Sequence, residues 1–168
     1  MEGARFGGTF ITTCKDKWTG AIKWSDTSHN LVVSTGLIHI LDTVLTAGDT
    51  ANDTWHIGLM EATPTVATAD QMSTHGFDES TFYDEANRVE WAEGRTGVSV
   101  SNTGNLATFT LNVDGSTIGG AFLASSNTKN GTAGVLLCGA AFSGGDKTGD
   151  SGDKLEVTYT FSAADDGV

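Results

Sequence analysis

One segment of this chain has the spacing of an α-helix, and the rest has the pattern of strands and turns. Between residues 30 and 48, large apolar side chains recur at offsets that place them on one helical face: Leu37, Ile38, Leu41, Val44 and Leu45. Ser34 or Thr35 can cap the start of this helix, and Gly48 follows its last apolar position. A helix of about three turns with so apolar a face is not stable alone in water, so we expect it to lie across a sheet.

The composition favours short strands joined by turns. The 168 residues include 22 glycines and a single proline, together with many Thr, Ser, Asn and Asp residues. These residues are unfavourable inside helices and common in turns. A chain of this length can bury a core as one domain. We therefore predict a single domain, residues 1–168, that is all-β with one short helix.

Short apolar or alternating runs separated by turn residues place the strands. Residues 6–13 and 18–24 are expected to form a hairpin, and residues 54–61 a core strand. Further strands are expected at residues 88–92, 98–102, 106–112, 118–125, 134–142 and 154–162. This spacing favours an antiparallel β-sandwich that is jelly-roll-like over a parallel sheet.

The charge of the chain limits its partners. The formal net charge is −12, from 9 Lys and Arg residues against 21 Asp and Glu residues. A surface this negative repels phosphate groups, which argues against nucleic acid and anionic membranes as partners. The N-terminal residues lack the apolar stretch of a secretory signal, and the longest apolar run is too short to span a bilayer. We expect a soluble protein made in the cytoplasm.

The residues that usually carry chemistry form no recognisable catalytic motif. The four histidines are scattered, and no Ser or Cys has the local pattern of an activated nucleophile. The acidic side chains of residues 78–93 can serve glycoside hydrolysis only if two of them converge, and a solvated acidic surface explains them as well. Cys14 and Cys138 are expected to be two buried thiols, although a disulfide is possible. We expect no enzyme activity and no cofactor.

Two further groups have a functional and a plainer interpretation. Asp146, Asp150 and Asp153 lie among glycines and can supply oxygen ligands to a calcium ion, but Gly and Asp also serve tight turns without a metal. The four tryptophans can form a sugar-binding platform, although core anchoring is the more usual role of Trp. We expect no metal site, and calcium remains a minor alternative.

Three blocks of sequence carry a resemblance to a known family. They are HNLVVSTGLIHILDTVL, TWHIGLME and the closing segment from IGGAFLAS to GDKLEVTYTFS. In this order they resemble small proteins from the structural gene clusters of tailed bacteriophages, and the match covers roughly residues 18–162. The better understood members of that family are similar to capsid cement or decoration proteins, whereas related ones are labelled phage structural or tail-fibre proteins.

The resemblance implies a role in the virion. Such a protein has a jelly-roll-like domain, binds the outer surface of the icosahedral head and clamps neighbouring major capsid subunits. The implied partners are the major capsid protein and further copies of the chain itself, as a dimer or trimer. The implied location is the outer capsid surface of a virion assembled in the host cytoplasm. The family has no catalytic motif to carry over.

The contacts with these partners are expected in two segments. One is a flexible, glycine-rich N-terminal arm, residues 1–10, and the other is the long loop of residues 62–82. The candidate contact residues in and beside these segments are Met1, Arg5, Phe6, Phe10, Pro64, Phe77, Phe82 and Tyr83. The alternative function is a tail-fibre or receptor- and glycan-binding module that uses exposed Trp91 or Tyr83 to stack on sugars. A glycoside-acting enzyme on the same fold is the third hypothesis.

Overall fold

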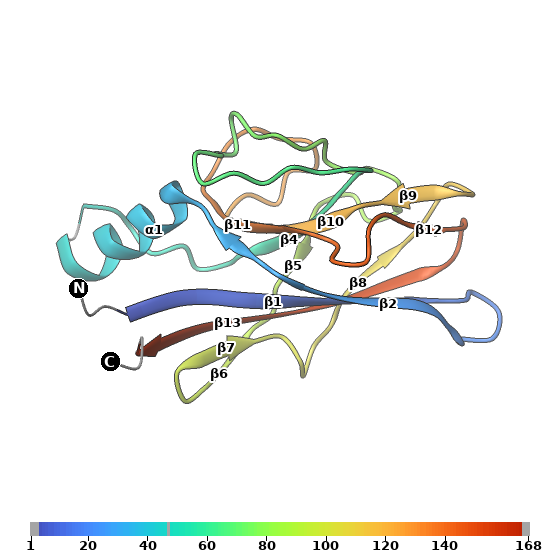
Figure 1. Cartoon of the computed structure of the whole chain (residues 1–168), viewed down its shortest axis with the longest axis horizontal. Helices are drawn as coiled ribbons and strands as arrows, with labels where there is room; N and C mark the ends of the chain where they lie inside the picture. Colours follow the sequence, from blue (N-terminus) through green and yellow to red (C-terminus); the bar gives the residue numbers. More distant parts are fainter. Residues whose placement is uncertain (1–3, 47, 166–168) are drawn as a thin grey trace.

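Two antiparallel sheets make up most of the protein, as seen in a computed structural model that describes residues 4–46 and 48–165 (Figure 1). In chain order the elements are β1 Ala4–Lys15, β2 Ile22–His29, β3 Leu31–Val32, α1 Ser34–Leu41, a π-helix Asp42–Thr46, β4 His56–Met60, β5 Val89–Glu90, β6 Gly94–Thr96, β7 Ser99–Ser101, β8 Ala107–Thr110, β9 Ser116–Ile118, β10 Gly120–Ala124, β11 Leu136–Ala141, β12 Lys147–Gly149 and β13 Lys154–Asp165. The first sheet has the order β2-β1-β13-β7-β6, with β8 also paired to β13, and the second has the order β3-β11-β10-β4-β5. The predicted all-β antiparallel sandwich with one short helix is confirmed.

The first sheet is built on the pairing of β1 with β13. Their register runs without a break from Ala4 opposite Asp165 to Lys15 opposite Lys154. Alternate residues of each strand point into the sandwich, because side chains in a strand alternate between its two faces. The inward ones include Phe10 and Tyr159, whose rings stack with their centroids 4.2 Å apart. The inward-facing residues of these two long strands form one side of the core.

The predicted flexible N-terminal arm is wrong for residues 4–10, and residues 1–3 lie outside the described residues. Residues 4–10 belong to β1 and are paired with β13 along their whole length. The glycines that suggested mobility serve packing instead. A Cβ on Gly8 would lie 2.3 Å from the carbonyl oxygen of Thr160 and 2.8 Å from the Tyr159 ring, so only glycine fits there. A deletion of residues 1–8 would not test the arm as a separate contact segment, because it would remove part of β1 from the sheet.

The hairpin between β1 and β2 is confirmed, with its second strand later than predicted. The turn is held by Asp16, whose carboxylate accepts hydrogen bonds from the backbone N–H groups of Trp18 and Thr19 at 3.0 and 2.8 Å. Gly20 completes the turn with a φ of 69°, a conformation that favours glycine. The strand then begins at Ile22 and continues to His29.

The second sheet is buried on both faces. Every residue of β10 is buried, as are most residues of β4 and β11. One face packs on the first sheet, and the loops of residues 61–88 and 125–135 lie over the other (Figure 1). A second apolar cluster, which includes Met72, Phe77 and Phe122, fills the space under these loops. The segment expected to be an exposed loop is thus a packed third layer.

A buried ion pair fastens this third layer. The guanidinium of Arg88 donates to both carboxylate oxygens of Glu79, at 2.8 and 2.7 Å, and both side chains are buried. Arg88 also donates to the carbonyl oxygens of Ser126 and Gly131, at 2.9 and 2.8 Å. The backbone N–H of Asn130 donates to Glu79 at 2.8 Å. Two loops far apart in sequence are therefore tied together by one pair of charges.

The two cysteines match the expectation of buried thiols. Cys14 and Cys138 are free and fully buried. Burial raises the pKa of the Cys14 thiol to about 11 and that of the Cys138 thiol to about 12. Cys138 lies 3.1 Å from the hydroxyl of Tyr159. Both behave as small core residues.

Candidate protein-docking surfaces

The apolar face of the helix points outward, opposite to the expectation that it lies across a sheet. The side chains concerned are partly or largely exposed: Leu37 37%, Ile38 55%, Leu41 46%, Val44 72% and Leu45 73%. We call these five side chains the ridge. In Figure 1, α1 and the π-helix stand at the end of the sandwich where β1 begins and β13 ends. The ridge is a concentrated apolar surface at that end of the molecule.

The helix is fixed by its smaller, more polar face. A Cβ on Gly36 would lie 2.4 Å from the carbonyl oxygen of Leu137, so the glycine lets the helix backbone lie directly on β11. His39 is 6% exposed, and its ring nitrogens lie 2.7 Å from the Asp49 carboxylate and 2.9 Å from the Asn52 amide nitrogen. No side chain caps the start of the helix, and the carbonyl of Thr68 instead accepts from the Ser34 N–H at 2.8 Å. These anchors decide which face is buried.

Two shallow depressions lie beside the helix. Ile40, Asn52 and Trp55 line both of them. The first has a volume of about 190 Å³ and also includes Val44, and the second has a volume of about 210 Å³ and also includes Trp91 and Phe161. We call the two together the end hollow. Val44 belongs to both the ridge and the end hollow, so the two surfaces are continuous.

The outward face of the first sheet forms a second candidate surface. Along most strands its side chains alternate with buried ones, and between ionisable residues at the two ends of the face, Lys15, Lys154 and Glu156 at one and Arg5 and His29 at the other, most of them carry hydroxyl groups. We call this surface the hydroxyl face: Thr9, Ile11, Thr13, Ser25, Thr27, Ser99, Ser101, Thr108, Thr110, Thr158, Thr160 and Ser162. Ile11 is 43% exposed and is flanked in register by Thr27 and Thr158. In the sequence, this face could have been predicted from Thr9, Ile11 and Thr13, which alternate with other residues along one strand.

Hydrogen bonds between neighbouring strands hold these hydroxyls in place. The Oγ atoms of Thr13 and Ser25 are 3.0 Å apart, and those of Ser99 and Ser162 are 2.7 Å apart. The Thr160 hydroxyl donates to Ser101 at 2.9 Å. Because these side chains are already ordered, a partner that binds them loses less conformational entropy. The charged Lys15–Glu156 pair lies toward the β1–β2 turn, away from Thr9 and Thr160.

A further surface depression lies on this sheet, around Gly7. Its volume is about 430 Å³, and its lining includes Arg5, Thr9, His29 and Ser162. The depression exists because Gly7 has no side chain and nothing lies within 4 Å of the position that its Cβ would occupy. The predicted contact residue Arg5 is exposed at its edge. The depression therefore combines a cationic group with hydroxyl groups.

Three of the predicted contact residues are core residues, which contradicts their assignment to a contact surface. Phe10, Phe77 and Tyr83 are 1%, 5% and 1% exposed. Phe10 is in β1 facing the core, and Phe77 packs under the third layer against Phe122, with ring centroids 5.1 Å apart. Tyr83 packs edge-on against Phe109, with ring centroids 4.9 Å apart. Their large apolar areas are used for folding.

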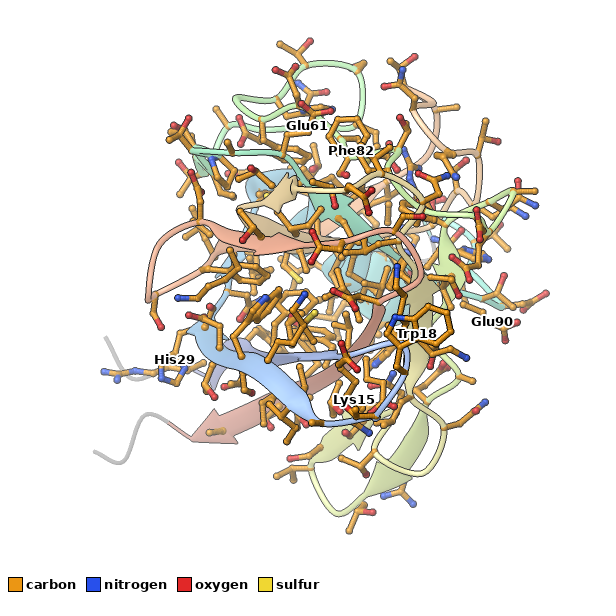
Figure 2. The ribbon with its side chains drawn as sticks, turned by 90° about the vertical axis from the view of Figure 1, so that its right-hand side faces the viewer. Lys15, Trp18, His29, Glu61, Phe82 and Glu90 are labelled. Atoms are coloured by element: carbon orange, nitrogen blue, oxygen red, sulfur yellow. The ribbon has the colours of Figure 1, made fainter. Side chains whose placement is uncertain are left out.

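The other predicted contacts are only partly accessible. Phe6 is partly buried and stacks on Phe161, with ring centroids 6.1 Å apart. Pro64 is also partly buried, and its Cδ would lie 2.4 Å from a Cβ on Gly119. Phe82 is partly buried on the loop side of the molecule (Figure 2). Met1 lies outside the described residues. The structure does not bring Phe6, Pro64 and Phe82 together as one patch.

The predicted sugar-stacking platform is wrong for both aromatic residues proposed. Trp91 is 5% exposed and donates from its indole N–H to the carbonyl oxygen of Tyr159 at 2.9 Å, and Tyr83 is in the core. The strongly exposed indole belongs to Trp18, which is 84% exposed on the β1–β2 turn (Figure 2). The ammonium group of Lys17 lies 5.5 Å from the centre of that ring.

The aspartates considered for calcium are used separately inside the protein. Asp146 accepts hydrogen bonds from the backbone N–H of Thr63 at 2.9 and 3.1 Å. Asp150 and Asp153 both bind the ammonium group of Lys23, at 2.8 and 2.6 Å. These contacts lower the pKa of the Asp150 carboxyl, through the Lys23 hydrogen bond first. The three carboxylates therefore do not face one shared position.

Within residues 4–46 and 48–165, no three His, Cys, Asp or Glu side chains lie together in an arrangement that could hold a metal ion. In the same part of the chain, no helix is long and apolar enough to cross a membrane. Comparisons with protein-family models, with curated proteins and with solved structures find no match to this chain.

Proposed function

We propose that this chain is a structural protein of a bacteriophage virion, a capsid cement or decoration protein. It binds the outer surface of the icosahedral head and clamps neighbouring major capsid subunits. The sequence resemblance described above supports this role. The structural observation that supports it most is the hydroxyl face, a broad, ordered surface whose central part around Ile11 has uncharged neighbours, on a chain with a net charge of −12.

The chemistry of the hydroxyl face suits binding to another folded protein. Hydroxyl groups both donate and accept hydrogen bonds, so they can pair with either kind of polar group on a partner. Charged residues are depleted at the centres of protein interfaces, and the centre of this face, around Ile11, carries hydroxyl neighbours. The threonine methyl groups and Ile11 add apolar area. A long two-strand floor, β1 with β13, keeps the surface rigid.

A decoration protein stabilises the capsid by binding, because a ligand that binds only one state shifts the equilibrium toward that state. Pressure from packaged DNA pushes capsid subunits apart, and a protein that binds only the expanded shell stabilises that state. Many copies, each with a modest affinity, are sufficient because symmetry repeats the contact over the shell. No bond needs to be made or broken.

Binding to heads tests the proposal directly. Heads that lack the protein, prepared from the phage that carries this chain, would be incubated with wild type, with Ile11→Glu and with Val113→Glu. Ile11 and Val113 are 43% and 44% exposed, but Val113 lies in the loop after β8, off the hydroxyl face. We expect wild type and Val113→Glu to saturate the heads and Ile11→Glu to bind at least tenfold more weakly. Equal binding of both variants would rule out the hydroxyl face as the docking surface.

A tail-fibre or receptor- and glycan-binding module is the second candidate function. The depression around Gly7 favours it, because Arg5 and the surrounding hydroxyl groups can bind an acidic sugar. Copy number distinguishes the two functions. Densitometry of purified particles should show a number of copies comparable to that of the major capsid protein for a decoration protein, and only a few copies for a tail component.

A further inference from the structure

We propose that the ridge and the end hollow bind a basic amphipathic segment of another protein, a helix whose apolar face is flanked by Lys or Arg. The five side chains of the ridge are between 37% and 73% exposed. Contiguous exposed apolar surface of this kind on a small protein marks a site of association. This docking surface is separate from the hydroxyl face, so the proposal goes beyond binding to a shell and does not rest on it.

The charged groups around this surface are acidic. Asp42 lies within the π-helix that carries part of the ridge, and Glu93 lines the end hollow. Asp49 and Asp53 are exposed in the loop before β4, and the Asp49 carboxylate contacts His39 of the helix. Among the described residues, no Lys or Arg lines either depression of the end hollow. The apolar surface therefore has a negative rim.

The sequence shows the same asymmetry over a longer stretch. Residues 24–87, which include the helix and the loop before β4, contain Asp and Glu residues but no Lys or Arg. Lys and Arg of a partner can therefore approach this rim without repulsion from a cation of the same stretch. Complementary charge of this kind speeds association and disfavours wrong partners. An apolar centre with a polar rim is also the usual anatomy of a protein interface.

The same charges argue against other occupants of this surface. Two copies that met here would place the acidic rim of one opposite the acidic rim of the other, and like charges repel. Helices that lie on a membrane surface carry Lys and Arg on their polar face, whereas the charged residue beside the ridge is Asp42. Anionic lipids attract basic segments and would repel this one. A basic protein segment fits both the apolar and the charged groups.

The shape of the surface suits a helix as the partner. Leu37, Ile38 and Leu41 share one exposed face of α1, against which a second helix can pack side by side. The two depressions of the end hollow, of about 190 and 210 Å³, lie next to this face and share Ile40 and Trp55 in their linings. They can receive apolar anchor side chains of the partner, as grooves that bind amphipathic helices do.

Titration calorimetry of the purified full chain with a synthetic helical peptide tests the proposal. The peptide carries leucines on one face and lysines on both flanks, and a scrambled peptide of the same composition controls for charge alone. We expect wild type to bind the helical peptide about tenfold more tightly than the scrambled one, because only the helical peptide presents a continuous apolar face. Added salt should weaken binding, since it screens the attraction between the lysines and the acidic rim.

One pair of matched substitutions tests the apolar contact. Ile38→Asn on the ridge is compared with Ile22→Asn at the start of β2, where the side chains are 55% and 63% exposed. Neither change alters the charge of the chain. Ile38→Asn should weaken binding of the helical peptide about tenfold, whereas Ile22→Asn should leave it unchanged. Matching thermal unfolding curves would establish that both variants are folded.

A second pair tests the charged rim. Asp53→Asn/Glu93→Gln removes two exposed carboxylates beside the end hollow, and Asp78→Asn/Asp84→Asn removes two exposed carboxylates from the segment that covers the second sheet. The net charge changes equally in the two double variants. We expect the first to weaken binding about threefold and the second to have no more than a slight effect, because exposed ion pairs act at short range.

Several outcomes would overturn the proposal. They are equal affinity of wild type for the two peptides, an equal effect of the two isoleucine substitutions, an equal effect of the two double variants, and binding that salt strengthens. Self-association of wild type that Ile38→Asn abolishes would also overturn it, because a second copy would then occupy the ridge. Binding to heads without binding to the helical peptide would contradict this proposal alone, whereas peptide binding without head binding would count against the proposed function alone.

Discussion

The Arg88 guanidinium and the Glu79 carboxylate form a two-point ion pair, with N to O distances of 2.8 and 2.7 Å, beneath the loops that cover the second sheet. Both side chains are buried, and together they bind three backbone groups of residues 126–131. A buried charge without its partner is costly, since it keeps its desolvation penalty and loses the attraction.

Arg88→Met should therefore lower the free energy of unfolding by about 3–5 kcal/mol, because Glu79 would remain buried and unpaired. Urea unfolding measures this change. The double variant Glu79→Leu/Arg88→Met should recover part of the loss, since no unpaired charge is left. Arg95→Met is the matched control, because Arg95 is exposed and its guanidinium bonds to the nearby Gly97 carbonyl. A change of less than about 1 kcal/mol in Arg88→Met would contradict this role.

The close contact of the helix with β11 predicts a strong effect of a single methyl group. Gly36→Ala would place a Cβ 2.4 Å from the Leu137 carbonyl oxygen, so the helix must move away from the sheet. We expect a loss of about 1–3 kcal/mol in the free energy of unfolding, as in other overpacked sites. Gly104→Ala is the control, since nothing lies within 4 Å of its Cβ position. Equal stability of the two variants in urea would show that the helix does not need this contact.

The buried aspartates predict a loss of stability in acid. Burial alone would raise the pKa of Asp153 and Asp26, but hydrogen bonds outweigh it and lower both pKa values: Lys23 and backbone N–H groups act on Asp153, and Ser28, Gly144 and Ser143 act on Asp26. In the unfolded chain both groups titrate near about 3.9. The unfolded state therefore binds more protons below that pH, and the stability from these groups is complete above it and declines as the pH falls through the folded pKa values.

The measurement is the free energy of unfolding between about pH 6 and pH 2. The free energy of unfolding of wild type should not change with pH near about pH 6, and it should fall progressively below about pH 4. Asp153→Asn should have a shallower slope, because one of the titrating carboxyl groups is gone. A wild-type stability independent of pH over this range would contradict the interpretation.

Both thiols should be unreactive in the folded protein. The thiolate is the reactive form, and burial raises the pKa of Cys14 to about 11 and of Cys138 to about 12. A disulfide reagent at about pH 8 should therefore label neither thiol in buffer and both in denaturant, where the thiols titrate near about 8.5. Rapid labelling of either cysteine without denaturant would show that the core opens more easily than its packing indicates.

The sequence was sufficient for the longer strands and the existence of the helix, but not for the short strands β3, β6, β9 and β12 or for the direction of the helix's apolar face. The spacing of Leu37, Ile38 and Leu41 shows that they share a face, and it contains no information on whether that face is covered. The outcome depends on Gly36 and His39, whose contacts with β11 and with the loop before β4 form only in the folded chain. Local periodicity does not report such contacts.

The contact residues were mispredicted for a related reason. Glycines near the N-terminus suggested a mobile arm, yet Gly8 is required because Tyr159 fills the space of a side chain. Phe77 and Tyr83 lie in a segment with loop composition, and their burial depends on how that segment folds: Phe77 packs on Phe122 of the second sheet and Tyr83 on Phe109 of β8. The hydroxyl face was overlooked because threonine in a strand normally indicates only β-propensity.

The position of β13 also has a consequence for how the chain reaches its native state. It lies between β1 and β7 and also pairs with β8, so the first sheet is incomplete until residues 154–165 are present. During synthesis on the ribosome, β1 emerges about 140 residues before its neighbour and must wait for it with an open edge. Pairing over such a sequence separation is slow, and unpaired edges are prone to aggregation. We expect nascent chains that stop before residue 154 to depend on chaperones.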